Sequence, residues 1–285
     1  MNALAELVRM FVPTLKQRSI LTAEQLEHWT EHGYVVLPGL FSSEQLQTID
    51  AEVDHHWAVS RTQRSELVVD LIGSSGARIL LHEAPIEARQ VPYKLNDLYL
   101  VSDRVRQVIL APTLVRVLTD LLGGAPLVCN SLNLEFGSQQ PCHTDSLYMT
   151  PPRDLNLVAS WIPLEDCVAE AGPLRFFPGS HKIPPFRFSS GKITAIESEM
   201  PRYQQYMQEH VDRLGLKEKR FCASAGDVFL WHSQLYHGGA PIENARRTRR
   251  SIVTHYFLAE DMPKSQRVRQ VPGGYWLRRS HQPTN

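Results

Sequence analysis

The residues in this sequence that are best suited to chemistry are two histidines and one aspartate: His143, Asp145 and His237. Two imidazoles and one carboxylate match the ligand set of mononuclear non-haem iron(II) oxygenases, in which three ligands on one face of an octahedron leave three positions free. Arg249 follows His237 by twelve residues, and its always-charged, forked guanidinium suits a dicarboxylate cosubstrate. The set therefore predicts an iron-dependent oxygenase.

A His-x-Asp triplet is a weak signal by itself, so the elements that must position it matter. Alternation along a strand would place the side chains of His143 and Asp145 on the same side. A later strand ends at residues 231–232, and the turn after it would bring His237 from another part of the sheet. Arg249 begins the next strand, at a spacing that could return it to the same cavity. Three separate segments are therefore predicted to meet at one ion.

The first 125 residues are predicted to be rich in helices. Capping boxes at Thr22 with Gln25 and at Ser42 with Gln45 predict two helix starts, and Gly33 predicts the end of the first helix. Further helices are expected over residues 103–122 and, as an amphipathic segment, over residues 1–12, with a short strand at residues 34–37.

After residue 125 the pattern changes to short strands bounded by proline and glycine. These strands are expected at residues 127–136, 155–162, 174–177, 227–231 and 251–258. They predict a mainly β fold with flanking helices, built on a double-stranded β-helix of the jelly-roll, cupin-like type. The whole chain, residues 1–285, is expected to be a single domain, divided into a buttress (1–125), a core (126–260) with a lid-like insertion (183–220) and a tail (261–285).

Several motifs follow one another in a characteristic order: CHTDSLY at 142–148, ASWIPL at 159–164, AGPL at 171–174, FPGSHK at 177–182, GDVFLWH at 226–232, YHGG at 236–239 and RRSI at 249–252. Together they resemble the phytanoyl-CoA dioxygenase family of iron(II)- and 2-oxoglutarate-dependent oxygenases. The resemblance covers roughly residues 125–258, and the entry strand at residues 33–40 is also similar.

The resemblance implies a cofactor, a cosubstrate and roles for individual residues. His143, Asp145 and His237 would bind Fe(II), which reacts with O2 and 2-oxoglutarate. Arg249 would hold the distal carboxylate of 2-oxoglutarate, with Trp161 beside it and Lys94 and Asn133 as further contacts. The implied reaction is hydroxylation of an unactivated C–H bond of a small molecule, with release of succinate and CO2. Many relatives have a serine two residues after the second histidine, where this chain has Gly239, so one cosubstrate hydrogen bond is expected to be missing.

Other residues near these motifs have alternative interpretations. Tyr148 and Met149 directly follow the triplet and are expected to contact the substrate. His232 competes with His237 for the role of ligand; we assign the ligand to His237 and regard His232 as a neighbour of the metal site or substrate, or else as an ordinary buried histidine. Arg247 and Arg250 are alternatives to Arg249 within one or two residues.

Composition limits the remaining function classes. Lysine plus arginine equals aspartate plus glutamate, at 30 each, so neither a nucleic acid nor a membrane is an expected partner. No apolar run approaches the about 18 residues that suggest a membrane span. Four cysteines without paired spacing indicate reduced thiols in the cytoplasm. Two rival classes stay open: a cupin-type metal-dependent isomerase or lyase, and a barrel that binds a small ligand without catalysis.

Overall fold

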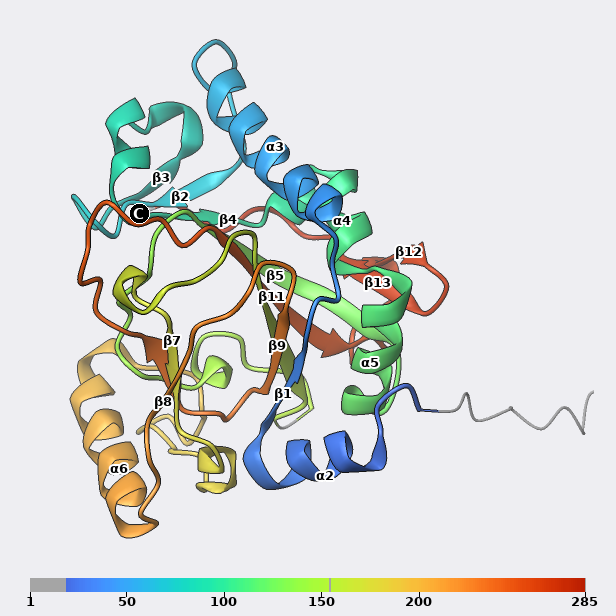
Figure 1. Cartoon of the computed structure of the whole chain (residues 1–285), viewed down its shortest axis with the longest axis vertical. Coiled ribbons are helices and arrows are strands. Elements are labelled where there is room, and N and C mark those ends of the chain that lie inside the picture. Colours follow the sequence, from blue (N-terminus) through green and yellow to red (C-terminus); the bar gives the residue numbers. More distant parts are fainter. Residues whose placement is uncertain (1–18, 154, 285) are drawn as a thin grey trace, which may run out of the picture.

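The computed structural model describes residues 19–153 and 155–284, which form two sheets flanked by helices (Figure 1). The helix predicted at residues 1–12 lies outside the described residues. The strands pair antiparallel in both sheets, apart from one parallel pairing near the C-terminus. The predicted combination of antiparallel β-structure with flanking helices is therefore confirmed.

The large sheet carries most of the strands. Its strand order is β1 (Tyr34–Leu37), β9 (Val228–His232), β6 (Leu157–Pro163), β11 (Ser251–Leu258), β5 (Pro126–Leu134), β4 (Lys94–Asn96), β2 (Val68–Asp70) and β3 (Arg78–Leu80). A C-terminal hairpin of β12 (Arg267–Val271) and β13 (Gly274–Leu277) joins it through the parallel pairing of β13 with β5. The small sheet has the order β10 (His237–Gly239), β7 (Leu174–Phe176) and β8 (Lys219–Phe221).

The two predicted capping boxes begin helices where the sequence indicates. Thr22 and Ser42 each accept a hydrogen bond from the backbone of a glutamine three residues later, and they start α2 (Ala23–His32) and α3 (Ser43–Val59). Gly33 ends α2 in the left-handed conformation, with φ 77°, which glycine adopts at little steric cost. The chain then enters β1, the edge strand beside β9.

The single helix predicted over residues 103–122 is wrong, because the structure has two helices there. α4 (Asp103–Ile109) ends before Pro112, and α5 (Pro112–Leu122) starts at it. Proline has no backbone N–H and disfavours helical dihedral angles in the preceding residue. Ala111 accordingly has φ −54° and ψ 139°. The break lets α5 pack across β5 and β6.

Short strands in the two terminal segments were not predicted. β2, β3 and β4 extend the large sheet from within the first 125 residues, and β12 and β13 form within residues 261–285. Each has three to five residues, which is too short to show a hydrophobic period. Both terminal segments therefore belong to the same sheet as the central strands.

Side chains of the large sheet alternate between two hydrophobic clusters. On β9, Val228 and Leu230 belong to the cluster that also contains the buried residues of α3, α4 and α5, whereas Phe229 and Trp231 belong to a second cluster. The second cluster also includes Leu174 and Phe176 from β7 of the small sheet. The space between the two sheets is therefore lined by the second face of the large sheet, where Trp161 also lies.

The predicted lid-like insertion contains the α-helix α6 (Met200–Arg213), preceded by a short 3-10 helix, and packs through its own apolar cluster. Ile183, Phe188, Tyr203 and Met207 are buried there with residues close to the first predicted ligand, including Cys142 and Leu147. Figure 1 shows α6 at the edge of the molecule on the side of the small sheet. Within the described residues, no helix has the length and apolar character needed to cross a membrane, and the four cysteines are free thiols.

Candidate metal centre

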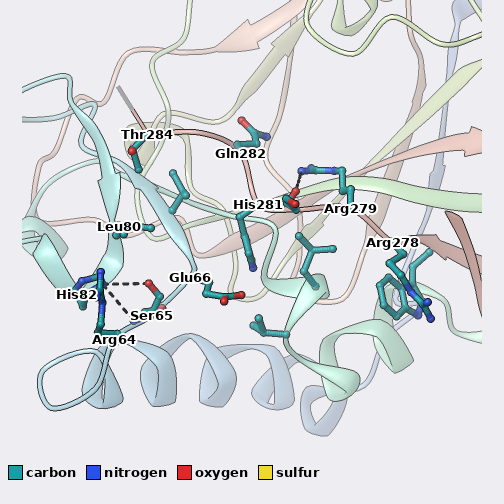
Figure 2. A pocket seen from close by; sticks show the side chains of 15 residues that line it. Arg64, Ser65, Glu66, Leu80, His82, Arg278, Arg279, His281, Gln282 and Thr284 are labelled. Atoms are coloured by element: carbon teal, nitrogen blue, oxygen red, sulfur yellow. Dashed lines mark hydrogen bonds between the residues drawn. The ribbon is translucent and has the colours of Figure 1, made fainter.

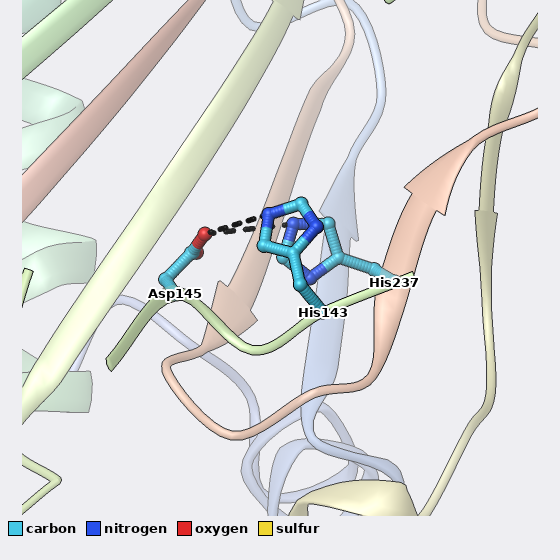
Figure 3. A group of neighbouring side chains, drawn as sticks. All are labelled: His143, Asp145 and His237. Carbon is cyan, nitrogen blue, oxygen red and sulfur yellow. Dashed lines mark ion pairs between the residues drawn. The ribbon is translucent and has the colours of Figure 1, made fainter. Parts of the chain in front are cut away.

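The structure brings His143, Asp145 and His237 together as a buried group (Figure 3). One potential ligand atom from each residue lies within 4.8 Å of the others. Asp145 Oδ1 is 3.7 Å from His143 Nε2 and 3.6 Å from His237 Nε2. Two imidazole nitrogens and one carboxylate oxygen at these separations are suited to a single divalent transition metal.

The backbone fixes the spacing of the two histidines. The N–H of His143 donates to the carbonyl of His237 at 2.7 Å, and the N–H of His237 donates to the carbonyl of His143 at 3.0 Å. This isolated antiparallel bridge extends the pairing of β10 beyond the small sheet. Two residues far apart in the chain are therefore directly opposite each other.

The prediction that a strand places the side chains of His143 and Asp145 on the same side is wrong about the element, because these residues do not form a strand. His143 forms only the isolated bridge, and Asp145 begins the short 3-10 helix η4 (Asp145–Leu147). Thr144 between them is extended, with φ −113° and ψ 139°, so one extended residue is enough to direct both side chains to the same side. The turn at Asp145 then takes the chain away from the site.

Hydrogen bonds select the ring nitrogen that each histidine offers to a metal. Nδ1 of His143 lies 2.9 Å from the carbonyl oxygen of Pro141, and Nδ1 of His237 lies 2.9 Å from that of Leu235. A carbonyl can only accept, so each Nδ1 carries a proton, and Nε2 is the ring nitrogen that each histidine can offer to a metal. Such partners of the second ring nitrogen fix both the tautomer and the ring orientation.

Trp231 orients the carboxylate. Its indole Nε1–H donates to Asp145 Oδ2 at 2.7 Å, which leaves Oδ1 facing the two histidines. Burial alone would raise the pKa of Asp145, but His237, His255 and His143 beside it hold that pKa well below its ordinary value. Burial also lowers the pKa of His237 to about 4. At neutral pH the site therefore offers an ionised carboxylate and a neutral imidazole, the states that metal binding requires.

Arg249 lines the same cavity as the three candidate ligands. Its side chain is only 4% exposed, its Nη1 donates to the carbonyl of Gly172 at 2.9 Å, and burial lowers its pKa to about 10. Among the described residues it has no acidic partner, and its Nε has no hydrogen-bond acceptor. Buried cations without a counter-charge are unfavourable, so this arrangement is suited to an anionic ligand.

The two neighbouring arginines are already neutralised elsewhere. Arg247 Nε pairs with Glu170 at 2.9 Å on the surface, and Arg250 Nε pairs with Glu165 at 3.1 Å. Neither lines the cavity of the candidate ligands. Of the three arginines considered from the sequence, Arg249 alone therefore has both the position and the unsatisfied charge for an anion in this cavity.

Two more predicted residues, Trp161 and Lys94, line the cavity. The guanidinium of Arg249 lies over the ring of Trp161, 5.4 Å from the ring centroid. Lys94 donates to Gln140 Oε1 at 2.7 Å, and burial lowers its pKa. Among the described residues, the cavity is thus lined by two cationic side chains, by the indole rings of Trp161 and Trp231, and by one carboxylate, that of Asp145.

Asn133 and His232 do not face this cavity. Along β5, Leu132 and Leu134 line it, whereas the side chain of Asn133 lies on the other face in a small cavity beside Asp50. His232 lies on the face of β9 opposite Trp231, with its ring 5.5 Å from that of His181, and burial lowers its pKa to about 4. The alternative interpretation of His232 as an ordinary buried histidine fits this position.

Tyr148 and Met149 lie at an adjoining outer cavity of about 380 Å³ that also reaches His143 and Asp145. Tyr148 is 52% exposed, and its ring lies 5.4 Å from that of His143. On the other side of Tyr148 is a further hollow of about 340 Å³, bounded by the start of α6. Both residues therefore lie where a molecule from solvent would approach the three ligands.

Gly239 is explained by close packing. A Cβ atom at this position would be 2.6 Å from Ser138 Oγ and 2.7 Å from the backbone nitrogen of Gln139. Ser138 lines the cavity together with Gly239 and Arg249. A larger residue at 239 would therefore displace the backbone at residues 138–139. The hydroxyl group of Ser138 lies at the same wall of the cavity, where many relatives have the hydroxyl of a serine at the position of Gly239.

A separate surface groove of about 1140 Å³ lies away from these ligands (Figure 2). It runs between residues 64–66 and the C-terminal segment 278–284, with His82 on one side. Its most buried cation, Arg279, is already paired with Asp97 at 2.7 Å. Within the described part of the chain the triad is the group that could hold a metal, so the groove does not compete as the candidate centre.

Sequence reasoning missed two residues beside the triad, Trp231 and His255. His255 Nε2 lies 3.4 Å from Asp145 Oδ1. Alternation from Arg249 along β11 could have found it, because Arg249, Val253 and His255 all line the cavity. Trp231 stands at the end of a predicted strand, but nothing in the sequence indicates which face of that strand it occupies.

The family profile of phytanoyl-CoA dioxygenase (PhyH) matches residues 29–251. The chain therefore belongs to this family, and the resemblance noted from its motifs is confirmed.

Solved structures share the fold. One is the non-haem α-ketoglutarate-dependent carbocyclase SnoK from nogalamycin biosynthesis, with 18% identity over 84% of this chain and 85% of the other and a TM-score of 0.60. Another is EctD from S. alaskensis with bound Fe, with 16% identity over 90% and 82% and a TM-score of 0.64. A third is HygX from Streptomyces hygroscopicus with nickel and 2-oxoglutarate bound, with 18% identity over 84% and 88% and a TM-score of 0.56.

The orientation of Asp145 by Trp231 generates a test. Trp231→Phe removes the hydrogen bond to Asp145 Oδ2 but keeps an aromatic ring at this position. We expect the affinity for Fe(II) or Mn(II), measured by equilibrium dialysis, to fall about 10- to 100-fold. Trp57→Phe is the matched control, because it removes an indole hydrogen bond to Tyr93 far from the site. Unchanged metal affinity in the Trp231 variant would mean that Asp145 does not depend on this bond.

The close packing at Gly239 generates a second test. Gly239→Ala should lower the free energy of unfolding by about 1–3 kcal/mol, as overpacking of a rigid contact does, measured by denaturant titration. Gly124→Ala is the control, because the nearest atom there is the tip of the Leu258 side chain, which can move. Equal effects of the two substitutions would contradict a backbone clash at position 239.

Proposed function

We propose that this protein is an Fe(II)- and 2-oxoglutarate-dependent dioxygenase that hydroxylates an unactivated C–H bond of a small molecule and releases succinate and CO2. Membership in the PhyH family supports the reaction class. The observation that carries the proposal is Arg249: a buried cation without an acidic partner among the described residues, in the same cavity as the metal-ligand set. A metal site alone does not need such a group, whereas a dicarboxylate cosubstrate does.

The residues present fit the metal. His143 Nε2, Asp145 Oδ1 and His237 Nε2 would hold Fe(II), and the remaining coordination positions would face the cavity. When bound, iron with 2-oxoglutarate and O2 supplies an oxidant able to attack an aliphatic C–H bond. The protein contributes ligands whose ring tautomers and orientations are held by hydrogen bonds to Pro141, Leu235 and Trp231.

The residues also fit the cosubstrate. Arg249 would form charge-assisted hydrogen bonds with the distal carboxylate of 2-oxoglutarate, and Gly172 holds the guanidinium in place. The ring of Trp161 lies against the guanidinium and would exclude water from this end of the cavity. Lys94 lines the same cavity and would balance negative charge on the cosubstrate. We assign no cosubstrate contact to Asn133, since its side chain lies on the other face of β5.

The two rival classes are less well supported. A cupin-type isomerase or lyase would use the metal ligands but has no need of a buried, unpaired arginine in the same cavity. A non-catalytic barrel has no need to keep all three ligands, and here each ligand is oriented by its own hydrogen bond. Within the oxygenase class, similar structures include a carbocyclase and an epimerase, so hydroxylation is the specific outcome that product analysis must test.

We further infer that the two sheets form a double-stranded β-helix, the arrangement expected for the family, within a single domain. In this arrangement residues 1–125 support the core, residues 183–220 act as a lid, and residues 261–285 close the sheet. Tyr148 and Met149 would contact the substrate at the outer cavity. Four free cysteines support a cytoplasmic location.

An anaerobic titration with Fe(II) and 2-oxoglutarate tests the proposal. The wild-type protein should develop the weak visible charge-transfer band of the bound pair. His237→Ala should abolish the band, because only two ligands remain. Arg249→Ala should weaken 2-oxoglutarate binding by about two orders of magnitude or more, since it removes one partner of a buried charge pair.

Arg250→Ala is the matched control, because the neighbouring arginine pairs with Glu165 outside the cavity. It should bind 2-oxoglutarate with wild-type affinity. A normal band in His237→Ala would contradict the ligand assignment. Equal 2-oxoglutarate affinity in Arg249→Ala and the wild type would contradict the role of the arginine, and absence of any band in the wild type would contradict the proposed function.

A further inference from the structure

His255 is a buried polar group beside the metal centre that the proposed function does not use. It is 2% exposed, and its Nε2 lies 3.4 Å from Asp145 Oδ1 without a hydrogen-bond partner among the described residues. It is not part of the group whose ligand atoms all lie within 4.8 Å of one another. With metal–imidazole bonds of about 2.1 Å, ligands of one ion are never more than about 4.2 Å apart, so His255 is not a fourth ligand.

A chain of hydrogen bonds fixes the tautomer of His255. The buried carboxylate of Asp97 accepts from Asn130 Nδ2 at 3.0 Å, and a carboxylate can only accept, so the amide nitrogen of Asn130 must face Asp97. Asn130 Oδ1 then faces His255 Nδ1 at 3.1 Å, and this nitrogen carries the proton. In this tautomer Nε2 is the ring nitrogen with the lone pair, and it is a buried hydrogen-bond acceptor without a donor among the described residues.

A second buried acceptor, Asn96 Oδ1, lines the same outer cavity. Asn96 is 1% exposed, and its Nδ2 donates to the carbonyls of Val68 and Lys94, both at 3.3 Å. These two carbonyls fix the amide orientation, and Oδ1 has no partner among the described residues. Buried acceptors without a donor are unfavourable by about 1–3 kcal/mol each. Two such acceptors around one cavity therefore point to a ligand that brings donors.

The rest of the outer cavity is also polar. It has a volume of about 380 Å³ and is lined by side chains that offer hydrogen bonds, including Asp70, Arg78, Gln140 and Gln282. Arg78 and Asp70 form an ion pair, so their charges are balanced within the wall. Its apolar lining comes from Leu132, Tyr148 and Met149. This volume is within the range of small-molecule sites, and this lining does not match a long hydrocarbon chain.

We propose that His255 binds the substrate by accepting, at Nε2, a hydrogen bond from a hydroxyl or amino group next to the metal, and that the substrate is a compact polyhydroxylated or aminated molecule such as a sugar or aminocyclitol. Asn96 accepts a second donor of the same molecule. The Asp97–Asn130 pair acts as a positioning device, because it keeps the acceptor nitrogen of His255 turned toward the cavity. The proposal rests on the proposed function, since it needs an oxidant at the metal.

The first experiment determines the substrate class. Wild-type enzyme with Fe(II) and 2-oxoglutarate is screened for stimulated succinate release with two panels of equal size. One panel contains sugars, amino sugars, cyclitols and aminocyclitols; the other contains fatty acids, acyl-CoA thioesters and aromatic hydrocarbons. We expect stimulation within the first panel. Stimulation confined to the second panel, or none in the first, would overturn the proposal.

The second experiment tests His255 with the most active compound of the first panel. Binding is measured anaerobically by the change that this compound causes in the charge-transfer band. His255→Phe should raise its Kd about 10- to 100-fold, as expected for a buried donor that loses its acceptor. His255→Gln, which retains an acceptor near the position of Nε2, should stay within about fivefold of the wild type. His232→Phe, on the opposite face of the sheet, should bind the compound normally.

The same measurements separate the possible failures. If His255→Phe binds the compound as tightly as the wild type, His255 is not a substrate contact. If His255→Phe and His255→Gln both lose Fe(II) binding instead, His255 supports Asp145 and the proposal is wrong. If the wild type forms no band with Fe(II) and 2-oxoglutarate, the proposed function itself fails.

Discussion

The paired backbone hydrogen bonds between His143 and His237 are the contact on which the rest of the site depends. They bring two distant segments into register, so that both rings emerge side by side. Each ring is then held by the carbonyl two residues before it, Pro141 for one and Leu235 for the other. The same local geometry on both segments directs both Nε2 atoms toward Asp145. Because the backbone sets these directions, the ligand geometry does not need the metal to form.

Charge balance connects this centre to the rest of the cavity. Within the described part of the chain, Asp145 is the one carboxylate that lines the cavity of the candidate ligands, where Arg249 and Lys94 bring two cations. Fe(II) and a 2-oxoglutarate dianion have no net charge together. The iron would nevertheless provide a positive charge for Asp145, and the two carboxylates would provide negative charges for Arg249 and Lys94. Binding would therefore give these buried charges partners of opposite sign, which offsets the cost of their desolvation. Balanced ion pairs such as Arg250 with Glu165 remain outside the cavity.

The sequence predicts features that depend on short-range chemistry. Capping boxes locate α2 and α3 because they are local hydrogen-bond patterns, and the ordered motifs locate the three ligands. It does not predict which face of a strand a residue occupies. The pairing of β5 with β11 has a register shift between His255 and Tyr256 of β11. Such a shift helps decide which residues of β5 face the cavity, and the side chain of Asn133 faces away from it. Short strands such as β2 and β13 form through pairing with distant segments, so no local pattern reveals them.

The central claim is that His143, Asp145 and His237 are already arranged to bind a metal through Nε2, Oδ1 and Nε2. The most direct measurement is a crystal structure of the protein with Fe(II) and 2-oxoglutarate, grown without oxygen, with anomalous differences recorded at the iron edge. We expect one anomalous peak bonded to these three atoms, with the Nδ1 hydrogen bonds to Pro141 and Leu235 unchanged and a cosubstrate carboxylate on Arg249. A peak bonded to Nδ1 of either ring, to His255, or at a different site would contradict it.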